Sequence, residues 1–91
     1  LSEKAHSEFP DGFFDWVYID GNHDYDLVKA DLELFLPKVK QGGYLTGDDY
    51  LQPSREKPSH IPVKEAVSDF LSENEVNVKK IIGGQFILQK N

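Results

Sequence analysis

Two short apolar runs with a helical pattern between them organise the first half of the chain. Residues 13–19 are apolar, rich in aromatic and β-branched side chains and too short for a helix, which predicts a buried strand, parallel to its neighbour. Residues 43–47 predict a second strand. An acidic start at residues 24–26 suits the helix dipole, and apolar positions then recur at helical spacing from Val28 to Val39. Strand, helix and strand within about 35 residues predict a right-handed parallel βαβ unit.

The segments around this unit extend the prediction. Leu1, Ala5 and Phe9 recur at the spacing of one helix face, which predicts a helix over residues 1–9. Pro37 is expected to end or distort the central helix, and Gly42-Gly43 to stop it.

The second half of the chain predicts a loop, a helix and a hairpin. Residues 51–60 are polar and broken by prolines, so they are expected to form a loop. Pro62 suits a first helical turn, and the apolar spacing that follows predicts a helix over residues 62–73. Two β-rich runs flank Gly83-Gly84 and predict an antiparallel hairpin. The predicted order of elements is therefore α-β-α-β-α-β-β.

Composition narrows the class of protein. The 91 residues make one small domain or a piece of one, and the first residue is Leu, which favours a fragment or a processed product. Without cysteine there is no disulfide and no thiolate metal site, which fits a cytoplasmic location. No apolar run approaches the roughly 18 residues of a membrane span, so no membrane association is expected.

The net charge of −6 is unevenly distributed along the chain. Residues 1–50 hold eleven acids against four lysines, whereas residues 51–91 hold five acids against six basic residues. Such a surface is a poor partner for nucleic acid and a better one for a divalent cation.

Three carboxylates follow the two predicted parallel strands: Asp20 after the first, and Asp48 and Asp49 after the second. Ligand sites in open α/β sheets lie at the carboxyl ends of the strands, where these groups would meet. Oxygen ligands of this kind suit Mg²⁺, Ca²⁺ or Mn²⁺. The alternative is that Asp20 caps the following turn, that Asp48 and Asp49 begin a loop, and that all three are solvated.

Other side chains near the same strand ends are candidates for chemistry. His23 follows Asp20 by three residues and is a candidate general base, or else a turn histidine bonded to a neighbouring carboxylate. Tyr25 and Tyr50 each follow a carboxylate motif and would line the cleft, or else cap the turns. The aromatic residues of the first strand are expected to pack in the core; they are Phe13, Phe14, Trp16 and Tyr18.

Two segments together carry a resemblance to a known family. Residues 19–25 read Ile-Asp-Gly-Asn-His-Asp-Tyr, and residues 42–50 read Gly-Gly-Tyr-Leu-Thr-Gly-Asp-Asp-Tyr. The chain resembles class I S-adenosylmethionine-dependent methyltransferases, in particular small-molecule O-methyltransferases that carry both segments. The resemblance implies a Rossmann-like α/β fold of which this chain is the carboxyl-terminal half, with a parallel βαβ unit and a terminal antiparallel hairpin.

The resemblance also implies site residues. Related metal-dependent O-methyltransferases hold a divalent cation on carboxylates after these two strands, which carries over to Asp20, Asp48 and Asp49 with Mg²⁺ as the cation. The metal would acidify a hydroxyl of a small-molecule substrate, which then attacks the methyl sulfonium. His23 is the candidate base, Asp20 is counted with it among the catalytic residues, and Tyr25 and Tyr50 are candidate substrate contacts.

One departure from the family is large. Its glycine-rich cofactor loop and the acidic residue after its second strand are missing, so residues 1–91 form a single partial domain without the cofactor-binding half. The chain alone is therefore expected to be inactive, although the parent protein would be an enzyme. The strand that would cover residues 14–19 is also missing, which predicts an open sheet edge and a homo-oligomer formed through it.

Two other functions stay open at this point. The chain could be a non-catalytic remnant of the fold that acts in assembly or binding. It could also be a metal-dependent hydrolase that uses the three aspartates with His23. The methyl acceptor, and transfer to oxygen rather than nitrogen, do not follow from the sequence.

Overall fold

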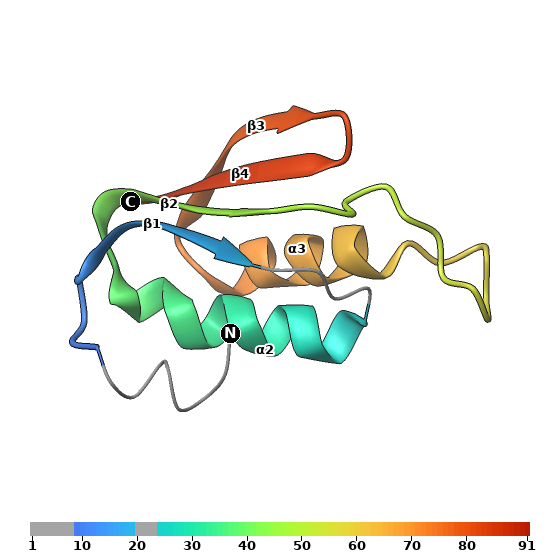
Figure 1. Ribbon diagram of the computed structural model, residues 1–91, viewed down its shortest axis with the longest axis horizontal. Helices are drawn as coiled ribbons and strands as arrows, with labels where there is room; N and C mark the ends of the chain where they lie inside the picture. The colour runs from blue at the N-terminus through green and yellow to red at the C-terminus, as the bar shows by residue number, and fades with distance from the viewer. Residues whose placement is uncertain (1–8, 20–23) are drawn as a thin grey trace.

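Four strands form one mixed sheet, and two helices pack against one of its faces (Figure 1). The computed structural model describes residues 9–19 and 24–91. The strands are β1 (Phe14–Ile19), β2 (Val39–Gly47), β3 (Val76–Ile82) and β4 (Gln85–Lys90), and they lie in the order β1-β2-β4-β3. The helices are α2 (Tyr25–Phe35), α3 (Pro62–Glu73) and a short 3₁₀ turn, η1 (Leu36–Lys38). The arrangement is a partial Rossmann-like α/β fold, as the sequence predicts. The predicted helix over residues 1–9 lies almost entirely outside the described residues.

The sheet combines a parallel pair with an antiparallel hairpin. β1 pairs with β2 in parallel, with Val17 opposite Leu45 and Ile19 opposite Gly47. β4 pairs antiparallel with both β2 and β3, so the hairpin is joined to the parallel pair through β4. The predicted βαβ unit and terminal hairpin are both confirmed.

The residues that flank α2 explain where this helix begins and where it ends. The Asp24 side chain caps the helix by accepting hydrogen bonds from the backbone N–H groups of Asp26 (2.9 Å) and Leu27 (3.4 Å). At the other end Pro37 lies in η1, and the chain enters β2 directly at Val39.

The prediction that Gly42-Gly43 stops this helix is wrong, because both glycines lie inside β2. Pro37 has already ended the helix, and Gly43 serves a different purpose. A Cβ atom at Gly43 would lie 2.6 Å from the carbonyl oxygen of Asp15, so β1 approaches β2 more closely there than a side chain would permit.

The core lies between the sheet and its two helices. Helix α2 contributes Val28, Leu32 and Phe35, and helix α3 contributes Val63, Ala66, Val67 and Phe70. The strands contribute inward-facing residues that include Leu45, Phe86 and Leu88. No described helix is long and apolar enough to cross a membrane.

β1 is buried on one face only, which corrects the expectation of a fully buried strand. Val17 and Ile19 point into the core, whereas Trp16 is 63% exposed and Tyr18 39% exposed. Phe13 is also half exposed, and Phe14 is the member of the predicted aromatic core set that packs against the core. The reason is that both helices lie on the same side of the sheet, so alternate residues of β1 face away from them (Figure 1).

Candidate functional site

The carboxyl ends of β1 and β2 lie at the same end of the sheet as the first turns of α2 and α3 (Figure 1). The turn of the β3–β4 hairpin reaches this end as well, because β4 runs antiparallel to β2 with Phe86 opposite Gly47. Five elements therefore converge where the sequence places its candidate residues.

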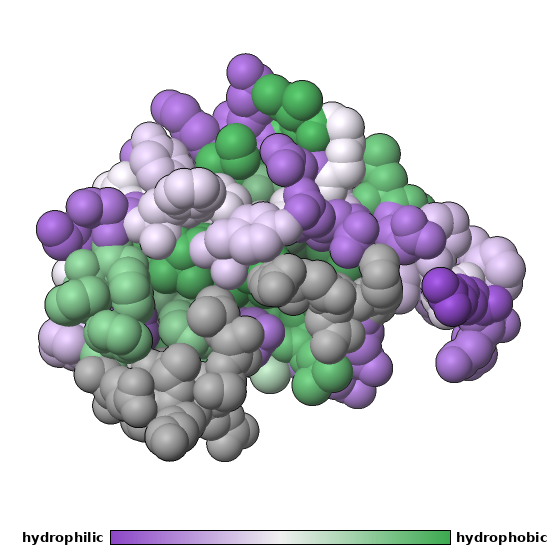
Figure 2. Space-filling view, in the orientation of Figure 1, coloured by the Kyte–Doolittle hydropathy of each residue, from purple (hydrophilic) through white to green (hydrophobic). Residues whose placement is uncertain are grey.

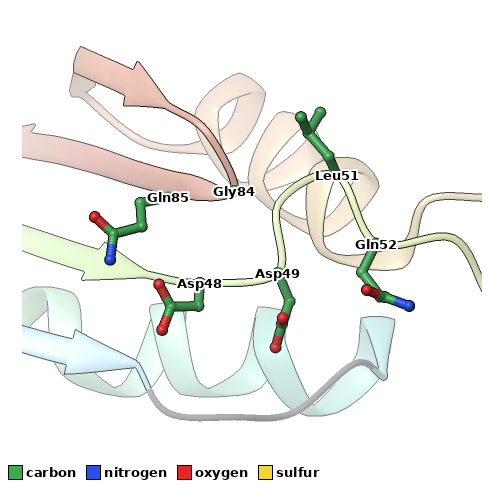
Figure 3. A pocket seen from close by; sticks show the side chains of 6 residues that line it. All are labelled: Asp48, Asp49, Leu51, Gln52, Gly84 and Gln85. Atoms are coloured by element: carbon green, nitrogen blue, oxygen red, sulfur yellow. The ribbon is translucent and has the colours of Figure 1, made fainter.

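A cavity of about 410 Å³ opens at the end of β2 (Figure 3). Its lining combines two carboxylates with polar and glycine positions of the following loop and the hairpin: Asp48, Asp49, Leu51, Gln52, Gly84 and Gln85. In Figure 3 the carboxylates of Asp48 and Asp49 point to the same side, away from the Leu51 side chain. The structure thus brings together two of the three predicted carboxylates.

Asp48 is positioned by the neighbouring strand. The hydroxyl of Tyr18 on β1 donates a hydrogen bond to Oδ2 of Asp48. Two residues earlier on each strand, the indole N–H of Trp16 donates to Oγ1 of Thr46 at 2.6 Å. The polar atoms of both exposed aromatic rings of β1 are therefore bonded to β2 or to the residue that follows it, and one of these bonds orients a carboxylate of the cavity.

Asp49 has a left-handed backbone conformation, with φ of 61°, and is the sole non-glycine residue with positive φ in the described parts of the chain. Aspartate tolerates this conformation better than most residues. Two backbone hydrogen bonds stabilise the turn: Gln52 N–H donates to the Asp49 carbonyl (3.1 Å), and Tyr50 N–H donates to the Gly84 carbonyl (2.8 Å). Strained conformations of this kind occur preferentially at functional sites.

Tyr50 lies beside the cavity without lining it. Its ring packs against the core, 6.2 Å between centroids from the ring of Phe86. Together with the bond from its N–H to Gly84, this contact attaches the loop to the hairpin. Its predicted contact with substrate stays a prediction.

Tyr25 lines a second, wider cleft of about 880 Å³ between the start of α2, the loop at residues 52–57 and the start of α3. Its hydroxyl donates a hydrogen bond to Oδ2 of Asp69 at 2.5 Å, and one turn further on Lys29 pairs with Glu73 at 2.8 Å. These two contacts connect α2 to α3 along the side of the cleft. The hydrogen bond to Asp69 raises the pKa of Tyr25 above its ordinary value of 10.0.

Replacing Tyr25 with Phe should therefore change how stability depends on pH. Because the folded-state pKa of Tyr25 is raised, the stability that it contributes is fully present below pH 10 and is lost as pH rises through the folded pKa. Urea unfolding of both proteins at pH 7 and at increasing alkaline pH measures this. A stability difference that persists unchanged well above the ordinary tyrosine pKa would contradict it.

The loop before α3 is also anchored. The Ser54 N–H donates to the His60 carbonyl at 2.9 Å, which closes the loop at its base. Glu65 accepts the Ile61 N–H at 2.8 Å and lies 3.3 Å from Nδ1 of His60. These contacts lower the pKa of Glu65, the bond from Ile61 contributing most.

The remaining predicted residues, Asp20 and His23, lie outside the described residues. Within residues 9–19 and 24–91, no group of three or more His, Cys, Asp or Glu side chains is placed to hold a metal ion. The sequence predicts three carboxylate ligands for Mg²⁺, and the described residues contain two of them, Asp48 and Asp49. The predicted Mg²⁺ site therefore depends on Asp20.

Sequence reasoning missed the contribution of the hairpin to this site, whereas it placed the loop at residues 51–60, with Arg55 and Lys57, beside the acidic cluster. Gly84 and Gln85 line the first cavity and Gln52 lines both. Arg55 and Lys57 line the second. The signal that would have found Gly84 and Gln85 is the antiparallel pairing of the last strand with β2, which brings the Gly-Gly turn beside Asp48.

Comparison with known proteins identifies the family. The family model of the methyltransferase domain matches residues 1–50, which is more than half of the chain and includes both candidate segments. The chain belongs to this methyltransferase family. Methyltransferases of this family depend in general on S-adenosylmethionine.

Two known proteins are also similar to this chain, one in sequence and one in structure. An uncharacterized protein of Acanthamoeba polyphaga mimivirus is 41% identical over 61 residues, which are 66% of this chain and 27% of the viral protein. A crystal structure of a protein from Corynebacterium glutamicum superposes with a TM-score of 0.66 at 17% identity, over 96% of this chain and 43% of that protein. The second similarity shows the fold alone. The chain thus spans less than half of the length of either protein.

Proposed function

We propose that the chain is the substrate-side half of an S-adenosylmethionine-dependent methyltransferase that transfers a methyl group to the hydroxyl of a small molecule. The observation that carries the proposal is the cavity at the end of β2, where Asp48 and Asp49, at the end of the segment matched by the family model, face the same space. The missing glycine-rich loop, together with the short coverage of the two similar proteins, supports a partial domain whose cofactor is bound by other polypeptide.

The roles of the residues follow from their chemistry. S-adenosylmethionine would supply the electrophilic methyl group. Asp48, oriented by Tyr18, would accept a hydrogen bond from the substrate hydroxyl and help to remove its proton, as a carboxylate general base does. Asp49 would place a second negative charge in the same cavity, which attracts a cationic group or a metal ion. Gln52 and Gln85 would supply neutral hydrogen-bonding groups for the rest of the substrate.

The participation of a metal ion can be tested separately from the rest of the proposal. In a metal-assisted reaction Asp48 and Asp49 would instead hold Mg²⁺ together with Asp20, and His23 would take the place of Asp48 as the base. The cation would lower the pKa of the bound hydroxyl.

A titration monitored by amide NMR tests the metal part. Mg²⁺ is expected to shift the resonances of Asp48, Asp49 and Gln85, and Asp48→Asn is expected to weaken its binding by about tenfold or more, which corresponds to at least ~1.4 kcal/mol. Glu75→Gln, an exposed site outside the lining of the cavity, is the matched control for loss of one charge. Equal effects of the two variants would remove Asp48 from the metal site.

A titration with S-adenosylhomocysteine tests the half-site assignment. The isolated chain is expected to show no saturable binding, because it has no glycine-rich cofactor loop. Tight binding by these 91 residues would overturn the assignment. A longer protein that contains this segment should bind the cofactor and should lose methyl transfer on Asp48→Asn while retaining cofactor binding.

A further inference from the structure

The loop between β2 and α3 carries two cationic side chains that the proposed reaction does not use. Arg55 and Lys57 are exposed, and neither pairs with a carboxylate anywhere in the described parts of the chain. Three lysines elsewhere each pair with one at 2.8 to 3.3 Å. Figure 2 shows hydrophilic residues gathered over this loop, which projects at the right of Figure 1. Two cations are thus available there for an anionic partner.

Both side chains line the second cleft, which adjoins the cavity of the proposed reaction. The cleft has a volume of about 880 Å³, and the described residues that line it come from the loop and from the starts of α2 and α3. Gln52 lines this cleft and also the cavity that contains Asp48 and Asp49. A molecule whose hydroxyl lies at Asp48 can therefore extend past Gln52 to Arg55 and Lys57.

Hydrogen bonds within the loop hold its cationic segment in place. The Lys57 N–H donates to Oγ of Ser54 at 3.2 Å, and the Lys57 carbonyl accepts from the His60 N–H at 2.8 Å. The bond from the Ser54 N–H to the His60 carbonyl, at 2.9 Å, closes the loop around both cations. A backbone that is already ordered loses less entropy when a ligand binds to it.

The cleft also contains negative charge. Asp24 and Asp26 line it at the start of α2, and Glu56 lies between the two cations in the sequence. The Asp24 carboxylate already accepts two backbone N–H groups as the cap of α2. Asp26 is the remaining acid on the α2 side, so an anion is expected to bind on the loop side, against Arg55 and Lys57.

We propose that the second cleft binds an anionic group of the substrate, a carboxylate or a phosphate, through Arg55 and Lys57. The inference rests on the proposed function, since it takes the substrate hydroxyl to lie at Asp48. The planar guanidinium of Arg55 matches both anions by donating two parallel hydrogen bonds, and the Lys57 ammonium adds a compact charge. The substrate class is therefore a small molecule that carries a hydroxyl at one end and an anionic group at the other.

Titration of the chain with inorganic phosphate, and separately with acetate, tests the anion site by amide NMR. Saturable shifts are expected at Gln52, Arg55 and Lys57, with ionic strength held constant because salt screens exposed charges. Arg55→Gln with Lys57→Gln should weaken binding by about tenfold or more. Lys64→Gln with Lys79→Gln removes two exposed lysines that do not line the cleft, and should leave binding unchanged. The probe that binds more tightly identifies the anionic group.

Asp26→Asn gives a test of opposite sign. It removes a negative charge from the lining of the same cleft, and should tighten binding of the preferred probe by about twofold or more. Glu75→Gln, an exposed position outside the lining, removes one negative charge as the control and should leave binding unchanged.

Three results would overturn the proposal. They are the absence of saturable shifts with either probe up to about 50 mM, equal weakening by the two double variants, and tightening by Glu75→Gln as large as that by Asp26→Asn. The second and third results would mean that the probes respond to the overall charge of the chain. None of these measurements involves methyl transfer. A longer protein that fails to bind S-adenosylmethionine would refute the proposed function and leave the phosphate titration unaffected.

Discussion

Phe86→Ala is expected to destabilise the chain by about 3–5 kcal/mol, the usual cost of removing a buried aromatic ring. Phe86 is 1% exposed and lies opposite Gly47, where a Cβ atom would be 2.6 Å from the end of the ring. The ring therefore fills space that the glycine leaves open. Small domains have total stabilities of about 5–15 kcal/mol, so this one substitution removes a large share.

Urea unfolding followed by far-UV circular dichroism measures the loss. Phe86→Leu retains most of the volume and should cost less than about 1.5 kcal/mol. Because the Phe86 ring packs on Tyr50, the alanine variant should also loosen the loop that carries Asp49, and amide exchange at Tyr50 reports this. A loss below about 1 kcal/mol would show that the hairpin is not held to β2 by this ring.

Much of the fold follows from local sequence signals. The central helix begins at Asp24 and the helix at 62–73 begins at Pro62, since both signals act within one turn of the chain. The hairpin follows from a Gly-Gly pair between two β-rich runs. Each of these signals is local, so no tertiary contact is needed to interpret it.

The burial of β1 could not be predicted in the same way. A run of alternating aromatic and aliphatic residues is typical of a strand covered on both faces, and the sequence does not state on which side the helices pack. The structure places both helices on one side. The polar atoms of Trp16 and Tyr18 bond instead to Thr46 and Asp48, which are partners thirty residues away in sequence.

The sequence predicts the part of the candidate site that lies at the ends of the parallel strands. Asp48 and Asp49 were found because they follow a predicted parallel strand, and the structure places them in one cavity. Gly84 and Gln85 were missed because their position depends on the pairing of β4 with β2. Strand order is a property of the whole sheet, and no local pattern contains it.

The adjacent glycines Gly42 and Gly43 are required for two different physical reasons, one for its backbone conformation and the other for the space around it. Gly42 has φ of +83°, and a Cβ atom there would have no neighbour within 4 Å, so this position needs a left-handed conformation but no extra space. Gly43 needs space, because a Cβ atom there would lie 2.6 Å from the backbone oxygen of Asp15 and 2.8 Å from the Val39 side chain. The same substitution at adjacent positions should therefore give different results.

Gly42→Asn is expected to cost less than about 1 kcal/mol, because asparagine tolerates the left-handed conformation. Gly43→Asn is expected to cost about 2–3 kcal/mol or more, because backbone atoms cannot move aside as side chains do. It should also separate β1 from β2, and therefore speed amide exchange in β1 and shift the fluorescence of Trp16, the single tryptophan of the chain. Equal costs at the two positions, with β1 unaffected, would mean that the close approach of Asp15 to Gly43 does not hold the parallel pair together.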